Sequence, residues 1–281
     1  MQLDLVTAGF AFGDGARWHD GRLWFSDLHD GCVRAVDPAT GVTSDVCAVP
    51  GSPSGLGWLP DGRLLVVSMH DRTVMRREPD GSLSTHASLD GIATFHCNDM
   101  VVDGRGNAYV GNFGSDYEPG VRRTPADLAL VRPDGSSVVA ARGLGFPNGS
   151  VVTPDGGTLV VAETMGRRLV SFAIADDGSL GPGRTWADLG RGLPDGICLD
   201  AEGCIWYADP RARTCTRVAE GGRVLATIAT DDACYACALG GDGRSTLFLI
   251  TAATDDPDQA REERSGRLWA AGADVPGAGW P

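Results

Sequence analysis

Four Asp or Asn side chains recur along the chain at positions that could bring their oxygens together. Asp14, Asn98, Asn148 and Asp195 each stand seven to nine residues before the glycine of a tight turn. Carboxylate and amide oxygens from separate segments are the ligands that hard cations such as Ca²⁺ and Mg²⁺ select. Any one of these residues could instead end a strand and form an Asx turn. Their shared offset from the turn favours a metal site.

The elements that would position these residues form a repeat. Six turn glycines lie 40 to 51 residues apart, at Gly21, Gly62, Gly106, Gly157, Gly203 and Gly243. Short apolar segments flank each turn, and such a period with four short strands per unit is typical of propeller blades. The sequence therefore predicts an all-β chain, a six-bladed β-propeller with four-stranded antiparallel blades.

In a propeller the first strand of each blade lines the axial channel, so the residues that begin these strands surround one mouth of it. They are Asp14, Ser54, Asn98, Asn148, Asp195 and Tyr235. A second polar set ends the second strand of each blade, near the same mouth: Asp27, Ser68, Asn112, Glu163, Asp209 and Thr251. We expect the acids of this second set to accept hydrogen bonds from loop amides and so to hold the blades together.

The last repeat is one strand short, whereas Leu3–Thr7 alternates apolar and polar residues and has no partner of its own. We expect it to supply the outer strand of blade six and to close the ring, which protects the sheet edges. The whole chain, 1–281, then forms one domain, because blades bury their faces only against their neighbours. We predict a surface loop at Asp255–Ser265 and a disordered tail after about residue 275.

The composition excludes several classes of function. A formal net charge of −13 argues against nucleic acid and anionic membrane surfaces as partners, since phosphate contacts need clustered cations. Neither a secretory signal nor an apolar run of transmembrane length is visible, which predicts a cytoplasmic protein with reduced thiols. Cys234 and Cys237 form a C-x-x-C pair without a second zinc-ligand pair. We interpret them as small buried hydrophobic residues.

Short motifs occur in a fixed order along nearly the whole chain. They are Asp14-Gly-Ala-Arg-Trp18, Leu23-Trp-Phe-Ser-Asp27, Asn98-Asp99, Phe146-Pro-Asn-Gly149, Thr153-Pro-Asp-Gly156, Pro194-Asp-Gly196 and Leu239-Gly-Gly-Asp242. In this order they resemble the family of gluconolactonase, senescence marker protein (regucalcin) and luciferin-regenerating enzyme. The resemblance implies a six-bladed propeller that holds one divalent cation in its channel and acts on a small molecule.

By this resemblance Asn148 and Asp195 are metal ligands, and Asn98 lies beside the metal, where it contacts substrate or water. Asp14 stands where the family usually has a Glu ligand. His96 stands where sugar-lactone members often carry an Arg that grips substrate hydroxyls. The implied cation is Ca²⁺, with Zn²⁺, Mg²⁺ or Mn²⁺ as alternatives.

Three functions are compatible with this pattern. The first is a metal-dependent hydrolase, a lactonase that opens a sugar-type or other small lactone with metal-activated water. Asp195 would accept the proton of that water, and the residues expected to contact substrate are Asn98, His96, Phe113 and Tyr117. The second is a phosphotriesterase-like hydrolase on the same metal, and the third is a calcium- or ligand-binding propeller without turnover. We expect a monomer or a small homo-oligomer.

Overall fold

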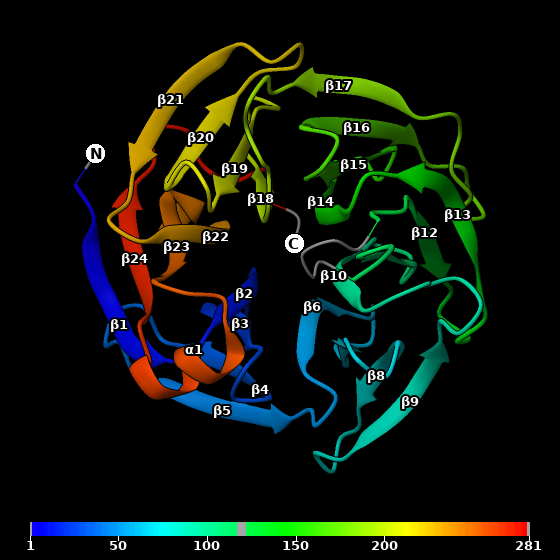
Figure 1. Cartoon of the computed structure of the whole chain (residues 1–281), viewed down its shortest axis with the longest axis horizontal. Coiled ribbons are helices and arrows are strands. Elements are labelled where there is room, and N and C mark those ends of the chain that lie inside the picture. The colour runs from blue at the N-terminus through cyan, green and yellow to red at the C-terminus, as the bar shows by residue number, and fades with distance from the viewer. Residues whose placement is uncertain (1, 117–121, 280–281) are drawn as a thin grey trace.

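The computed structural model describes residues 2–116 and 122–279. Figure 1 shows six β-sheets that follow one another around a ring, each with four antiparallel strands. The predicted six-bladed β-propeller is thereby confirmed. Consecutive innermost strands contact each other around the ring, including the first and the last of them.

The four strands of each sheet succeed one another from the channel outward. From innermost to outermost, the first sheet contains β2 (Gly13–His19), β3 (Arg22–Asp27), β4 (Cys32–Val36) and β5 (Thr43–Ala48). In the same order, the second contains β6 (Pro53–Trp58), β7 (Leu64–Ser68), β8 (Thr73–Arg77) and β9 (Leu83–Ser88). The third contains β10 (Cys97–Val102), β11 (Ala108–Asn112), β12 (Ala126–Val131) and β13 (Ser137–Leu144).

The second half of the ring repeats this plan. The fourth sheet contains β14 (Pro147–Val152), β15 (Thr158–Glu163), β16 (Arg168–Ala173) and β17 (Arg184–Asp188). The fifth contains β18 (Ile197–Leu199), β19 (Ile205–Asp209), β20 (Thr214–Val218) and β21 (Val224–Ala229). The sixth contains β22 (Ala233–Gly240), β23 (Thr246–Ala252), β24 (Gly266–Gly272) and β1 (Asp4–Phe10).

The hydrophobic cores lie between neighbouring sheets, and β7 shows how the sequence produces them. Its residues Leu64–Ser68 begin with four consecutive aliphatic side chains, all of them buried. Because successive side chains of a strand point to opposite faces, Leu64 and Val66 join the core shared with the first sheet. Leu65 and Val67 join the core shared with the third sheet. Burying each such side chain contributes about 1.5–3 kcal/mol, so every sheet stabilises both of its neighbours.

The N-terminal strand belongs to the last sheet. β1 pairs with β24 in an antiparallel register that runs from Asp4 opposite Ala270 to Phe10 opposite Gly266. The predicted pairing of Leu3–Thr7 with the last blade therefore holds, although the strand extends to Phe10. The further expectation that this pairing closes the ring stays a prediction.

Two segments differ from the sequence-based expectation. Asp255–Ser265 contains the short helix α1 (Pro257–Glu263), whose N-cap Asp256 accepts a hydrogen bond from the Gln259 amide at 2.9 Å. The chain after residue 275 is hydrogen-bonded as far as Ala278, whose amide donates to the Leu199 carbonyl at 3.0 Å. The composition alone indicated a loop for the first segment and a disordered tail for the second. The N-cap stabilises a helix in the first, and the contact with Leu199 holds the second in place. Within the described residues, no helix has the length and apolar character needed to cross a membrane.

Candidate functional site

The six residues predicted to surround one mouth of the channel begin or directly precede the innermost strands. Asp14 lies in β2, Asn98 in β10 and Asn148 in β14, each as the second residue of its strand, and Asp195 lies two residues before β18. We call this end the Asp14 mouth. Asp14, Asn148 and Asp195 lie close together: the Asn148 side chain hydrogen-bonds the Asp195 carboxyl and lowers its pKa, whereas the nearby charge of Asp14 raises it.

The amide of Asn148 is held in one orientation by Thr164, which directly follows β15. The Thr164 hydroxyl donates its single proton to the Pro194 carbonyl at 2.6 Å. It can therefore only accept from Asn148, whose Nδ2 donates to it at 3.2 Å. The Oδ1 of Asn148 is buried and has no hydrogen-bond partner among the described residues. Because an unpartnered buried oxygen is costly, a cation is a natural partner for it.

The two carboxylates beside Asn148 are poorly solvated. Burial, followed by the charge of Asp99, raises the pKa of Asp14 from 3.8 to about 7, although the Gly15 amide opposes this by donating to its Oδ1 at 2.7 Å. Burial and then Asp14 raise the pKa of Asp195 well above its ordinary value. With Asp99 and its partner Arg17, three carboxylates and one guanidinium carry a formal charge of −2 when all are ionised. One divalent cation would balance that charge.

The donor set fits a hard divalent cation. Asp14, Asn148 and Asp195 would supply two carboxylates and one neutral amide oxygen, and such oxygens are what Ca²⁺ and Mg²⁺ prefer. Nowhere in residues 2–116 and 122–279 do three or more His, Cys, Asp or Glu side chains converge as a ligand group. The candidate set therefore depends on the amide of Asn148 as well as on the two acids.

A buried ion pair crosses the channel below these residues. Arg17 of the first sheet donates through Nη2 to both carboxylate oxygens of Asp99 in the third sheet, each at 3.0 Å. Both side chains are at most 5% exposed. Removing one partner of such a pair costs about 3–5 kcal/mol, because the other charge is left buried alone. The pair links the innermost strands of the first and third sheets, β2 and β10.

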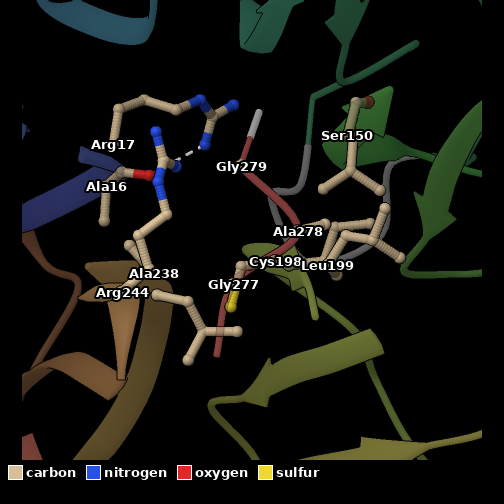
Figure 2. A pocket seen from close by; sticks show the side chains of 13 residues that line it. Ala16, Arg17, Ser150, Cys198, Leu199, Ala238, Arg244, Gly277, Ala278 and Gly279 are labelled. Atoms are coloured by element: carbon tan, nitrogen blue, oxygen red, sulfur yellow. Dashed lines mark hydrogen bonds between the residues drawn. The ribbon is translucent and has the colours of Figure 1, made fainter. Parts of the chain in front are cut away.

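Figure 2 shows a small pocket between the inner strands, beside which the side chains of Arg17 and Arg244 extend toward each other. The segment Gly277–Gly279 completes the wall of a cavity of about 20 Å³. A cavity of this size holds about one water molecule. This cavity is therefore too small for an organic substrate.

Three of the four predicted substrate contacts lie at the Asp14 mouth. Asn98 is buried, and its Nδ2 donates to the Pro147 carbonyl at 3.3 Å. His96 stacks on Phe95 with ring centroids 4.0 Å apart, and burial followed by the charge of His70 lowers its pKa. The Phe113 amide donates to the His96 carbonyl at 2.9 Å. The fourth residue, Tyr117, lies outside the described residues.

Two of the acids that end second strands, Asp27 and Asp209, hold loops of the same mouth as expected, whereas Glu163 accepts hydrogen bonds from the Arg168 side chain. Asp27 accepts hydrogen bonds from the amides of Ala11 and Phe12 at 3.2 and 2.9 Å. Asp209 accepts from the Leu193 amide at 2.9 Å. These acids fix the backbones that lead into the strands of Asp14 and Asp195.

The eight cysteines are free in the structure. Cys234 and Cys237 are both buried, which agrees with their interpretation as small hydrophobic residues. Cys237 also approaches a cysteine outside the C-x-x-C pair, because the Sγ of Cys198 lies 3.7 Å from the Sγ of Cys237.

Sequence reasoning missed two residues that shape the site. Arg17 appeared only as a letter within a motif, and nothing in its spacing indicates that it pairs with Asp99, 82 residues away. Thr164 follows Glu163, which was recognised as a strand-end residue, but its contacts with Asn148 and Pro194 depend on how neighbouring blades approach. The available signal was weak: Thr164 is a hydroxyl residue directly after a strand that pairs with the strand of the Asn148-Gly149 motif.

Residues 12–253 match a sequence family described as SMP-30/Gluconolactonase/LRE-like region. The chain belongs to this family. One relative of this SMP-30/gluconolactonase/LRE-like protein is the pentonolactonase XacC of Haloferax volcanii. The two sequences are 28% identical over 288 residues, which cover 99% of this chain and 95% of the relative. The regucalcin of Xenopus laevis is 26% identical, covering 94% of this chain and 92% of the relative.

A solved luciferin-regenerating enzyme shares the fold of this SMP-30/gluconolactonase/LRE-like protein. It superposes with a TM-score of 0.84 at 19% sequence identity, covering 98% of this chain and 97% of the other. The family match over residues 12–253 confirms the membership that the ordered motifs indicated.

Proposed function

We propose that this protein is a divalent-cation-dependent lactonase whose cation is held by Asp14, Asn148 and Asp195. The observation that carries the proposal is the Asn148 amide, whose buried oxygen has no hydrogen-bond partner among the described residues while the same side chain hydrogen-bonds the Asp195 carboxyl. Ca²⁺ is the preferred candidate because all donors are oxygens, and Zn²⁺, Mg²⁺ or Mn²⁺ are alternatives. The shorter Asp14, at the position where the motifs indicate Glu, still places a carboxylate in this set.

When bound, such a cation supplies Lewis acidity, which polarises a lactone carbonyl and lowers the pKa of water. Asp195 is the group suited to take the proton of the attacking water, because burial raises its basicity. Asn98 and His96 orient the substrate at the same mouth. Because the pKa of His96 is lowered, this ring is neutral at pH 7 and can donate one hydrogen bond.

The lactonase activity is supported by membership of the SMP-30/gluconolactonase/LRE-like family and by the relative named pentonolactonase. A fold does not determine the reaction, so the proposal depends on the site and needs a direct test.

The test is Asp195→Asn, which keeps an oxygen near the cation but removes the charge and the basicity. Lactone hydrolysis should fall by roughly 10²-fold or more even at saturating metal, because proton transfer contributes about that factor. Asp14→Glu is the companion variant, since it restores a longer carboxylate and should preserve or raise metal affinity. Full activity of metal-saturated Asp195→Asn would leave Asp195 as a ligand only. Hydrolysis of phosphotriesters but not of lactones would favour the second reaction, and metal binding without turnover would favour a binding protein.

A further inference from the structure

A second set of six residues surrounds the Asp14 mouth, further from the channel centre. These residues stand two positions before the six that ring the mouth, and we call them the upper tier: Phe12, Ser52, His96, Phe146, Leu193 and Ala233. The tier contains no carboxylate, amide or guanidinium. Its one hydroxyl, Ser52 Oγ, already donates to the Leu28 carbonyl at 2.8 Å. We call these largely apolar positions the collar; the charges of Asp116 and Arg72 act on its His96 from outside the set.

Rings from different blades connect this collar. The ring of Phe12 in the first blade contacts Tyr235 of the sixth with centroids 4.5 Å apart. The ring of Phe113 in the third blade contacts Phe146, which leads into the fourth blade, at 4.6 Å. Phe113 also packs against the apolar cluster that contains Phe12, Met69 and Tyr235. Residues of the first, second, third, fourth and sixth blades thus form one apolar cluster, in which Phe12, Met69 and Tyr235 are buried and Phe113 and Phe146 are partly exposed.

The collar is held rigidly at its backbone. Asp27 accepts from the Phe12 amide, and Asp209 accepts from the Leu193 amide, each at 2.9 Å. Phe146 adopts a left-handed backbone conformation with a φ of 61°. For a bulky side chain this conformation is strained, and such strain persists where the surroundings impose it, often at functional sites. The Thr164 amide contributes by donating to the Phe146 carbonyl at 3.2 Å.

We infer that the preferred substrates are lactones that carry an alkyl or aryl substituent, rather than polyhydroxylated sugar lactones. The inference rests on the proposed function, because it concerns the substrate of the same site. Each buried methylene should raise kcat/KM about fourfold through its transfer from water to the collar. Each sugar hydroxyl that loses water without gaining a partner should lower it by about tenfold. His96 is half-buried between Phe95 and His70, and a single neutral ring cannot satisfy several hydroxyls.

Two matched pairs of lactones test this substrate class. γ-Butyrolactone and γ-nonalactone share a ring and differ by an alkyl chain, whereas δ-valerolactone and glucono-δ-lactone share a ring and differ by hydroxyl groups. With added Ca²⁺ or another divalent cation, we expect kcat/KM to be at least 10²-fold higher for γ-nonalactone than for γ-butyrolactone. We expect it to be at least 10²-fold lower for glucono-δ-lactone than for δ-valerolactone. The opposite order in either pair would overturn the inference.

Binding of ketone analogues keeps the inference testable if no lactone is turned over. 2-Pentylcyclopentanone and cyclopentanone cannot be hydrolysed, so their dissociation constants report the collar alone. Absence of turnover with tight, chain-dependent ketone binding would refute the lactonase and support the apolar site. Equal dissociation constants would overturn the inference whatever the activity.

Phe146→Asn locates the effect in the collar, since Asn tolerates the left-handed backbone. It should lower kcat/KM for γ-nonalactone by about 10-fold or more and change that for γ-butyrolactone by less than about threefold. The same variant should weaken 2-pentylcyclopentanone binding. His19→Ala is the control, because His19 stacks on Trp58 at the far end of the inner strands. An equal loss for both lactones in Phe146→Asn, or the same selective loss in His19→Ala, would overturn the assignment to the collar.

Discussion

Thr164 offers a test of the metal site that does not change any proposed ligand. Thr164→Val has nearly the same shape but removes the hydroxyl that donates to the Pro194 carbonyl at 2.6 Å and accepts from Asn148 Nδ2 at 3.2 Å. Without it the Asn148 amide keeps only its hydrogen bond to Asp195 and loses the contact that fixes the direction of its oxygen. Groups that orient metal ligands typically contribute 10–100-fold in metal affinity. We therefore expect the dissociation constant for Ca²⁺ to rise by that factor, or about 1.4–2.7 kcal/mol.

Isothermal titration calorimetry with chelator-treated protein measures this loss, and urea unfolding measures the accompanying change in stability. The metal-free variant should lose about 1–3 kcal/mol in the free energy of unfolding, because buried polar groups lose their partners. Thr164→Ser is the matched control, since it keeps the hydroxyl and should retain nearly all of the affinity. A folded Thr164→Val protein that binds Ca²⁺ as tightly as Thr164→Ser would refute the orientation argument.

Two further predictions concern stability. Because the pKa of Asp14 is raised from 3.8 to about 7, the native metal-free protein holds a proton that the unfolded chain releases. Its free energy of unfolding should therefore fall as the pH rises from about 4 to 7, by up to about 4 kcal/mol. Asp14→Asn should flatten this decline in urea titrations, and an equal slope in both proteins would contradict the assignment. Deleting residues 1–8 should expose the β24 edge and promote aggregation, and a truncated protein that stays monomeric in light scattering would argue against ring closure by β1.

Much of the fold could be predicted because residues close together in the sequence determine the strands and turns of each blade. Each glycine turn connects the first two strands of a blade, and runs such as Leu64–Val67 supply side chains to both neighbouring cores. The same turns locate Asp14, Asn148 and Asp195, since each begins or precedes an innermost strand. Counting from a turn therefore identifies residues at the mouth without knowledge of any long-range contact.

The rest depends on contacts between distant segments. The Arg17–Asp99 pair joins the first and third blades across the channel, and no local pattern encodes it. The tail amide of Ala278 finds its partner in Leu199 of the fifth blade, so composition alone indicated disorder. Of the residues in and around the apolar collar, the sequence predicted only Phe113 and His96 as substrate contacts. The collar's other rings, Phe12 and Phe146, become a set once the offset of two residues is applied to every blade.

The central claim is that one divalent cation at Asp14, Asn148 and Asp195 is required to open a lactone. The most direct measurement is the hydrolysis rate of γ-nonalactone by chelator-treated protein, titrated with Ca²⁺ and then with Mg²⁺, Mn²⁺ and Zn²⁺. We predict that activity is lost on chelation and returns with one equivalent of at least one of these cations, and that Asn148→Ala shifts this titration to much higher metal concentration. Full activity of the chelated protein, or a titration unchanged in Asn148→Ala, would contradict the proposed site.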